Sequence, residues 1–166
     1  MDTIKAAIFD LDGTLVDSMW VWEKVDMEFL GKRGYTVPEN LKDNITHLSF
    51  KQVAQYFKTT FSIDDSVEAI MDEWHEMAYN EYSNNVFLKE GAMEYLHSLK
   101  KAGIKIALAT SNSKPLLEAT LKNNGIYDLF DSITVTDEVK KGKDNPDIYL
   151  LAAEKLNVNP VNCMVY

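Results

Sequence analysis

The spacing of hydrophobic and polar positions changes twice along this chain and divides it into three stretches. Near the N-terminus an unbroken apolar run at 6–9 predicts a strand that is buried on both faces. From 18 to 83 apolar residues recur every three or four positions, which predicts helices only. From about 90 onward short apolar runs alternate with helical spacing. This order predicts an α/β fold with a parallel sheet and a helical block inserted after the first strand.

Helix start signals subdivide the inserted block. Asp17 or Ser18 is expected to cap its first helix. The segment Ser49-Phe50-Lys51-Gln52 has the form of a capping box, and Asp65 with Glu68 resembles a second one. The last helix of the block is expected to present one long apolar stripe, made of Val67, Ile70, Met71, Trp74, Ala78 and Tyr82.

The final stretch alternates helices and strands, as a parallel sheet with right-handed crossovers requires. Glycines end two of these helices, and a proline at 146 suits the first position of a third. Helices are expected at about 90–102, 115–124 and 146–156. Strands are expected at 104–109, 133–135 and 163–166.

Composition narrows the possible partners. The chain has 166 residues, 46% of them apolar, and a formal net charge of −9. This charge argues against a nucleic-acid backbone or an anionic membrane surface as partner. One cysteine and three histidines give neither a disulfide framework nor a zinc pattern. No apolar run approaches the roughly 20 residues that span a bilayer, and no signal peptide is evident, so a cytoplasmic protein is expected.

Two carboxylates follow the first strand directly. Asp10 and Asp12 lie one residue apart, and alternate residues of a strand share a face. Gly13 allows the chain to turn there. Carboxylates at the carboxyl end of a parallel strand suit phosphoryl transfer with Mg²⁺, one as nucleophile and the other as general acid and base. The alternative is a pair of helix-capping acids without catalytic meaning.

Three segments in order resemble a known family. The string Asp-Leu-Asp-Gly-Thr-Leu-Val-Asp-Ser at 10–18 resembles the first motif of the haloacid dehalogenase-like hydrolases. Ala-Thr-Ser-Asn-Ser at 109–113 matches the second motif, a Thr or Ser that ends a strand. Gly-Lys-Asp-Asn-Pro-Asp at 142–147 resembles the third, with Asp144 where proline is usual. The resemblance covers nearly the whole chain and implies a Rossmann-like core, 1–16 and 85–166, with a helical cap, 17–84.

The resemblance assigns roles to four residues. Asp10 would attack phosphorus and form an aspartyl-phosphate, and Asp12 would protonate the leaving oxygen and then activate water. The Asp10 carboxylate and the Asp12 carbonyl would bind Mg²⁺. Thr110 and Lys143 would hold the transferring group, whose catalysis is mostly positioning and electrostatics. Without the resemblance, Lys143 would be read as part of a solvated lysine cluster.

Further residues are candidates for substrate binding. Gly13 and Thr14 follow the two acids, and the main-chain N–H groups of Ser111 and Asn112 could hold phosphoryl oxygens. The alternative for this second segment is a simple helix cap. Lys51, in the cap, is the candidate for a substrate contact from that side, and a solvent-facing lysine is its alternative.

The favoured function is a magnesium-dependent phosphatase that hydrolyses a small phosphorylated metabolite. A sugar-phosphate mutase of the β-phosphoglucomutase type shares the same motifs and remains an alternative. A signalling receiver domain fits less well, because receivers have no helical insertion after the first strand. Substrate identity and oligomeric state are left open.

The family's fourth motif is an acidic pair just after the strand that would match 163–166, and it completes the magnesium site. This sequence ends at Tyr166. The resemblance therefore predicts a truncated chain that binds Mg²⁺ poorly and has little activity, or an inactive fragment.

Overall fold

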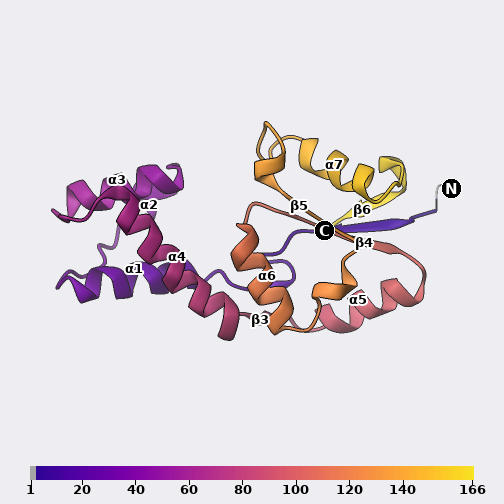
Figure 1. The fold of residues 1–166 in the computed structure, drawn as a ribbon, viewed down its shortest axis with the longest axis horizontal. Helices are drawn as coiled ribbons and strands as arrows, with labels where there is room; N and C mark the ends of the chain where they lie inside the picture. The colour runs from indigo at the N-terminus through magenta and orange to yellow at the C-terminus, as the bar shows by residue number, and fades with distance from the viewer. Residues whose placement is uncertain (1–2) are drawn as a thin grey trace. The chain divides into compact units, whose positions relative to one another are not determined.

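The computed structural model describes residues 3–166, which form two compact units (Figure 1). One unit is Trp20–Glu81 and consists of helices. The other unit combines the residues before Trp20 with Tyr82–Tyr166 and contains all the strands. None of the described helices is both long enough and apolar enough to cross a membrane.

A four-stranded parallel sheet forms the centre of the α/β unit, which confirms the predicted fold class. The strand order is β5-β4-β1-β6, so β1 lies between two neighbours. The strands are β1 (Ala6–Phe9), β4 (Lys105–Thr110), β5 (Ser132–Val135) and β6 (Cys163–Val165). Every residue of β1 is buried, as expected for a central strand covered on both faces.

Helices cover the two faces of this sheet. Figure 1 shows α5 (Ala92–Lys101) and α6 (Lys114–Asn123) on one side and α7 (Asp147–Lys155) on the other. Alternate residues of β1 point to opposite faces. Ala6 and Ile8 belong to the core cluster that includes three α7 residues, whereas Phe9 packs edge-on against Tyr95 of α5. Short 3₁₀ turns connect the remaining elements at Tyr127–Leu129, Thr136–Glu138 and Pro160–Asn162.

A small antiparallel ribbon, which the sequence did not indicate, pairs the segment before the inserted helices with the segment after them. Strand β2 (Val16–Asp17) pairs with β3 (Phe87–Leu88), with Val16 opposite Leu88. Strands of two residues carry too little alternation to be recognised in a sequence. The ribbon holds the end of the segment after β1 against the start of the segment that leads to α5.

Four helices make up the inserted stretch: α1 (Val21–Lys32), α2 (Leu41–Ile45), α3 (Phe50–Thr60) and α4 (Val67–Asn84). Phe29, Phe57 and Trp74 form its aromatic core, with the Phe57 and Trp74 ring centroids 4.9 Å apart. The last residues of α4, from Tyr82 on, belong to the α/β unit.

The predicted capping box at Ser49 is confirmed, with both reciprocal hydrogen bonds to Gln52 formed. Helix α1 begins at Val21 after Trp20, whose own side chain makes no capping hydrogen bond. Asp17 as the cap of this helix stays a prediction. The Ser18 hydroxyl donates to a carboxylate instead, because a charged acceptor forms a stronger bond than a neutral one.

The predicted box of Asp65 with Glu68 is also wrong by one residue. The Ser66 hydroxyl accepts a hydrogen bond from the Ala69 N–H at 3.1 Å at the start of α4. Asp65 instead pairs with Arg33 at 2.8 Å. An available arginine partner outweighs the local capping preference at this position.

Candidate active site

A tight loop follows β1 and carries both predicted catalytic acids. The Leu11 carbonyl accepts hydrogen bonds from the N–H groups of Thr14, Leu15 and Val16, at 2.9–3.2 Å. Gly13 has a φ of +78°, a conformation that L side chains rarely adopt. The Lys89 ammonium group donates to the Gly13 carbonyl from beyond β3. The loop is therefore closed on itself and tied to the segment that follows the ribbon.

Asp10 is paired with Lys143 although 133 residues separate them. The Asp10 N–H donates to the Tyr166 carbonyl at 3.2 Å, so strand-like pairing continues past the end of β1. Strand alternation then places Asp10 on the face that α7 covers, and Lys143 lies in the loop before α7. The Lys143 ammonium group donates to the Asp10 carboxylate, and both side chains are partly exposed.

Asp12 has a separate set of partners. Its Oδ1 accepts hydrogen bonds from Ser18 Oγ at 2.6 Å and from the Tyr82 hydroxyl at 2.5 Å. Its Oδ2 accepts one from Asn112 Nδ2 at 3.0 Å. Burial, and then the nearby Asp12 carboxylate, raise the pKa of Tyr82 well above its ordinary value. The Tyr82 phenol is therefore a neutral donor at any working pH.

The segment after β4 contributes to the same region. Thr110 ends that strand, is 1% exposed, and its hydroxyl accepts a hydrogen bond from the Asn112 N–H at 3.0 Å. The Asn112 side-chain oxygen accepts a hydrogen bond from the Ser113 N–H at 2.8 Å, which fixes the orientation of its amide. Ser111 is exposed. The main-chain N–H of Asn112 is thus engaged within the protein, whereas the sequence predicted it as a phosphoryl donor.

Lys51 lies in the helical unit, on the first turn of α3. Its ammonium group is 3.7 Å from Glu68 Oε1, and its side chain is 72% exposed. Surface pairs of this kind contribute little and leave the lysine free to exchange partners. A substrate contact by Lys51 stays a prediction.

Two oxygen donors of this site could coordinate Mg²⁺. Residues 3–166 contain no group of three or more His, Cys, Asp or Glu side chains that could hold a metal ion. The Asp12 carboxylate already accepts three hydrogen bonds. The Asp10 carboxylate and the Asp12 carbonyl remain as hard oxygen donors. Magnesium is often held by one or two carboxylates together with substrate phosphate and water. These residues therefore fit a magnesium ion that the protein and a phosphorylated substrate coordinate together.

Sequence reasoning did not find three of the contacts on this site. Ser18 lies within the first motif, so its position there was a signal that went unused. Tyr82 was predicted only as part of an apolar stripe, and 70 residues separate it from Asp12. The bond from Lys89 to Gly13 crosses 76 residues and has no local signature.

Comparisons with known proteins agree with this arrangement. The model of the haloacid dehalogenase-like hydrolases matches residues 4–166. A phosphorylated carbohydrates phosphatase of Thermotoga maritima is 30% identical over 98% of this chain and 76% of its own length. Hexitol phosphatase A of Escherichia coli is 33% identical, over 97% and 73%. A solved β-phosphoglucomutase from Clostridium difficile superposes with a TM-score of 0.73 at 26% identity, over 98% and 75%.

The chain belongs to the haloacid dehalogenase-like hydrolase family. This membership confirms the family that the three sequence motifs indicated. Together with the phosphatase relatives, it makes the protein an enzyme of the phosphoric monoester hydrolase kind.

Proposed function

We propose that the protein is a magnesium-dependent phosphatase that hydrolyses a small phosphorylated metabolite through an aspartyl-phosphate. The observation that carries this proposal is the bond from the Lys143 ammonium group to the Asp10 carboxylate. Such a lysine offsets the repulsion between that carboxylate and an incoming phosphate dianion. The phosphatase relatives support the same reaction class.

The proposed chemistry has two steps. In the first, an Asp10 oxygen bonds to phosphorus, the bond from phosphorus to the leaving oxygen breaks, and Asp12 gives that oxygen a proton. In the second, water attacks the phosphorus of the aspartyl-phosphate, Asp12 takes a proton from the water, and phosphate leaves. Asp10 is regenerated at the end.

Other residues orient the phosphoryl group. Lys143 would neutralise its charge, and the Thr110 hydroxyl and the Ser111 N–H, at and just after the end of β4, would donate to its oxygens. Gly13 and Thr14 line the same loop as the two acids. The Asp10 carboxylate and the Asp12 carbonyl would hold Mg²⁺, which supplies positive charge next to the phosphoryl oxygens.

A sugar-phosphate mutase is the second candidate, because the chain superposes on a solved β-phosphoglucomutase at a TM-score of 0.73. A mutase returns the phosphoryl group to the sugar, whereas a phosphatase gives it to water. Turnover of β-glucose 1-phosphate to an isomer without release of phosphate would favour the mutase.

A panel of phosphorylated sugars, sugar alcohols, nucleotides and short acids tests the proposal by release of inorganic phosphate. We expect turnover of at least one member. Asp10→Asn should reduce the rate of phosphate release by several orders of magnitude, because an amide is not a competent nucleophile. Asp128→Asn, at an exposed position of the same unit, is the matched control and should keep the wild-type rate. Wild-type turnover by Asp10→Asn would refute the mechanism.

A further inference from the structure

Three donors from three separate segments converge on the Asp12 carboxylate. Ser18 follows β2, Asn112 follows β4, and Tyr82 lies in the last turn of α4. All three belong to the α/β unit. We propose that Tyr82 is a positioning residue that fixes the Asp12 carboxylate, so that one defined oxygen, Oδ2, exchanges the proton with substrate and water. This inference rests on the proposed function, which gives Asp12 its proton-transfer role.

The Tyr82 hydroxyl is committed to this contact. The residue is 2% exposed, so no bulk water competes for its hydrogen bond. A buried hydroxyl without a partner costs free energy, and a bond to a carboxylate is stronger than one to a neutral acceptor. The rigid ring, fixed by its burial, limits where the hydroxyl can move. Ser18, also 2% exposed, completes the pair of hydroxyl groups on the same oxygen.

The two carboxylate oxygens are not equivalent in this arrangement. A carboxylate oxygen has two lone pairs, and the hydroxyl groups of Ser18 and Tyr82 occupy both on Oδ1. The amide nitrogen of Asn112 occupies one on Oδ2, which leaves the other able to carry a proton. The Asn112 amide is itself oriented by the bond it accepts from Ser113. Oδ2 is therefore the atom available for proton transfer.

The proton balance is simple. While Asp10 bonds to phosphorus, the proton on Asp12 Oδ2 moves to the leaving oxygen, and the carboxylate left behind is held by all three donors. When water attacks the aspartyl-phosphate, its proton moves to Oδ2. Tyr82 and Ser18 keep their own protons throughout, because they orient the carboxylate and do not take part in the transfer.

Loss of the Tyr82 hydroxyl should therefore slow the reaction according to how much the leaving group needs a proton. Phenyl phosphate and p-nitrophenyl phosphate have similar shapes, but nitrophenolate leaves without protonation. We expect Tyr82→Phe to lower kcat/KM for phenyl phosphate by about 10–100-fold, a part of the 10²–10⁴-fold that general acid catalysis supplies. For p-nitrophenyl phosphate the expected loss is less than about 3-fold, because kcat/KM ends with departure of the leaving group.

The contact can also be tested through Asp12 itself. If Tyr82 acts through this carboxylate, Tyr82→Phe should have no further effect in an Asp12→Asn protein, since coupled residues are not additive. Tyr79→Phe removes a hydroxyl from an exposed position of the same helix. It should leave kcat/KM unchanged for both aryl phosphates. Thermal unfolding of each variant shows whether the fold is intact. If Tyr82→Phe does not fold, Ser18→Ala is measured in its place, because it removes the other hydrogen-bond donor to Asp12 Oδ1.

Equal losses on the two aryl phosphates would overturn the inference, because a structural defect does not depend on the leaving group. So would an undiminished effect of Tyr82→Phe in the Asp12→Asn protein. Wild-type turnover of phenyl phosphate by Asp12→Asn itself would instead refute the proposed function. The two failures are therefore distinguishable.

Discussion

Asp10 and Lys143 carry opposite charges at a position where a doubly negative substrate would have to enter. The protein has a formal net charge of −9, so its overall field opposes such a substrate. Lys143 is the described cation that contacts the predicted nucleophile. Its contribution should therefore appear both in binding and in the rate of phosphoryl transfer.

Lys143→Ala should lower kcat/KM by about 10²–10³-fold, the usual cost of removing one preorganised charge donor. Lys143→Arg should recover part of the loss, because the charge returns with a different shape. Lys140→Ala, at an exposed lysine three positions earlier, is the control and should keep the activity. The measurement is initial-rate kinetics of phosphate release. Matching losses in Lys140→Ala and Lys143→Ala would mean that the cluster acts only through general charge.

Asp26 on α1 gives a prediction for stability against pH. Burial, and then the charge of Glu23, raise the pKa of Asp26 to about 7 from a model-peptide value of 3.8. The folded state therefore holds this proton more tightly than the unfolded state. The stability that this brings is complete below about pH 4 and is lost as the pH rises through about 7.

Asp26→Asn should therefore raise the melting temperature above pH 7 and should lose this advantage as the pH falls towards 4. The gain at pH 8 should be on the order of 1–3 kcal/mol, since one pKa unit corresponds to about 1.4 kcal/mol. Melting curves of both proteins between pH 4.5 and 8.5 test this. Glu76→Gln, at an exposed acid of α4, is the control. A gain that is constant across this range would contradict the assigned cause.

The site residues were predictable from the sequence only where they lie within a short sequence motif. The sequence indicated Asp10, Asp12 and Lys143 as site residues, and the structure brings Lys143 to Asp10. The bond that Tyr82 makes to Asp12 was not predictable. It depends on tertiary placement, because a buried tyrosine in an apolar stripe looks the same whether its hydroxyl faces a carboxylate or not.

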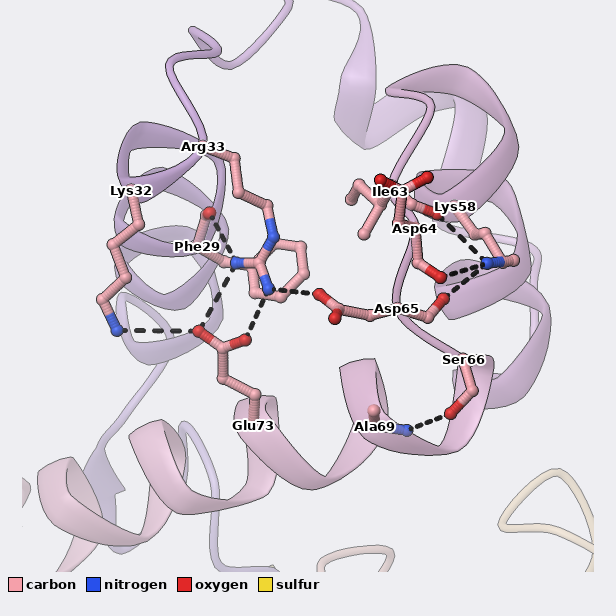
Figure 2. A network of polar contacts seen from close by, with 10 residues as sticks. All are labelled: Phe29, Lys32, Arg33, Lys58, Ile63, Asp64, Asp65, Ser66, Ala69 and Glu73. Atoms are coloured by element: carbon pink, nitrogen blue, oxygen red, sulfur yellow. Dashed lines mark hydrogen bonds and ion pairs between the residues drawn. The ribbon is translucent and has the colours of Figure 1, made fainter.

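At the scale of elements, one arginine connects three parts of the helical unit (Figure 2). Arg33, just after α1, donates to both carboxylate oxygens of Glu73 on α4 and to Asp65 in the loop before that helix. Its guanidinium carbon lies 3.8 Å from the Phe29 ring centroid. The Lys58 ammonium group, on α3, donates to three consecutive carbonyls of the same loop, those of residues 63–65. This network fixes the α3–α4 connection against α1.

Arg33→Lys should destabilise the protein by about 1–2 kcal/mol, because lysine keeps the charge but cannot form the two-pronged bond to Glu73 or stack on Phe29. Lys32→Ala is a matched control, since Lys32 is 59% exposed and 3.6 Å from the same glutamate. It should cost no more than about 0.5 kcal/mol. Urea unfolding measures both. Equal costs would show that the network contributes only ordinary surface charge pairing.

Element prediction succeeded where one periodicity ran long enough. Spacing and helix start signals indicated the helices of the inserted stretch, and short apolar runs indicated the four parallel strands. The β2–β3 ribbon was missed because two-residue strands have no period. Helix starts were less predictable than helices: Ser49 caps α3 as predicted, but the Ser18 hydroxyl bonds to Asp12 and Asp65 pairs with Arg33. Charge pairing replaced the local capping preference at Asp65.

At the scale of the whole molecule, sheet order determines which chain segments can complete a metal site. Strand β6 pairs with β1, and the Asp10 N–H donates to the carbonyl of Tyr166. Residues placed directly after Tyr166 would therefore emerge beside Asp10. The family resemblance predicts an acidic pair at this point, and no cluster of three potential ligands exists among residues 3–166.

The 166-residue chain should therefore bind Mg²⁺ only weakly, because magnesium loses its water reluctantly and finds here one carboxylate and one carbonyl. Inorganic phosphate should tighten the binding, since it adds an oxygen ligand, and Mg²⁺ should tighten phosphate binding by the same factor. A version that continues past Tyr166 with two acidic residues should bind Mg²⁺ more tightly and release phosphate faster. Calorimetry and phosphate release on both lengths, with a chelator as the metal-free control, measure these effects. Equal affinity and equal turnover at the two lengths would show that Asp10 and its neighbours suffice for the ion.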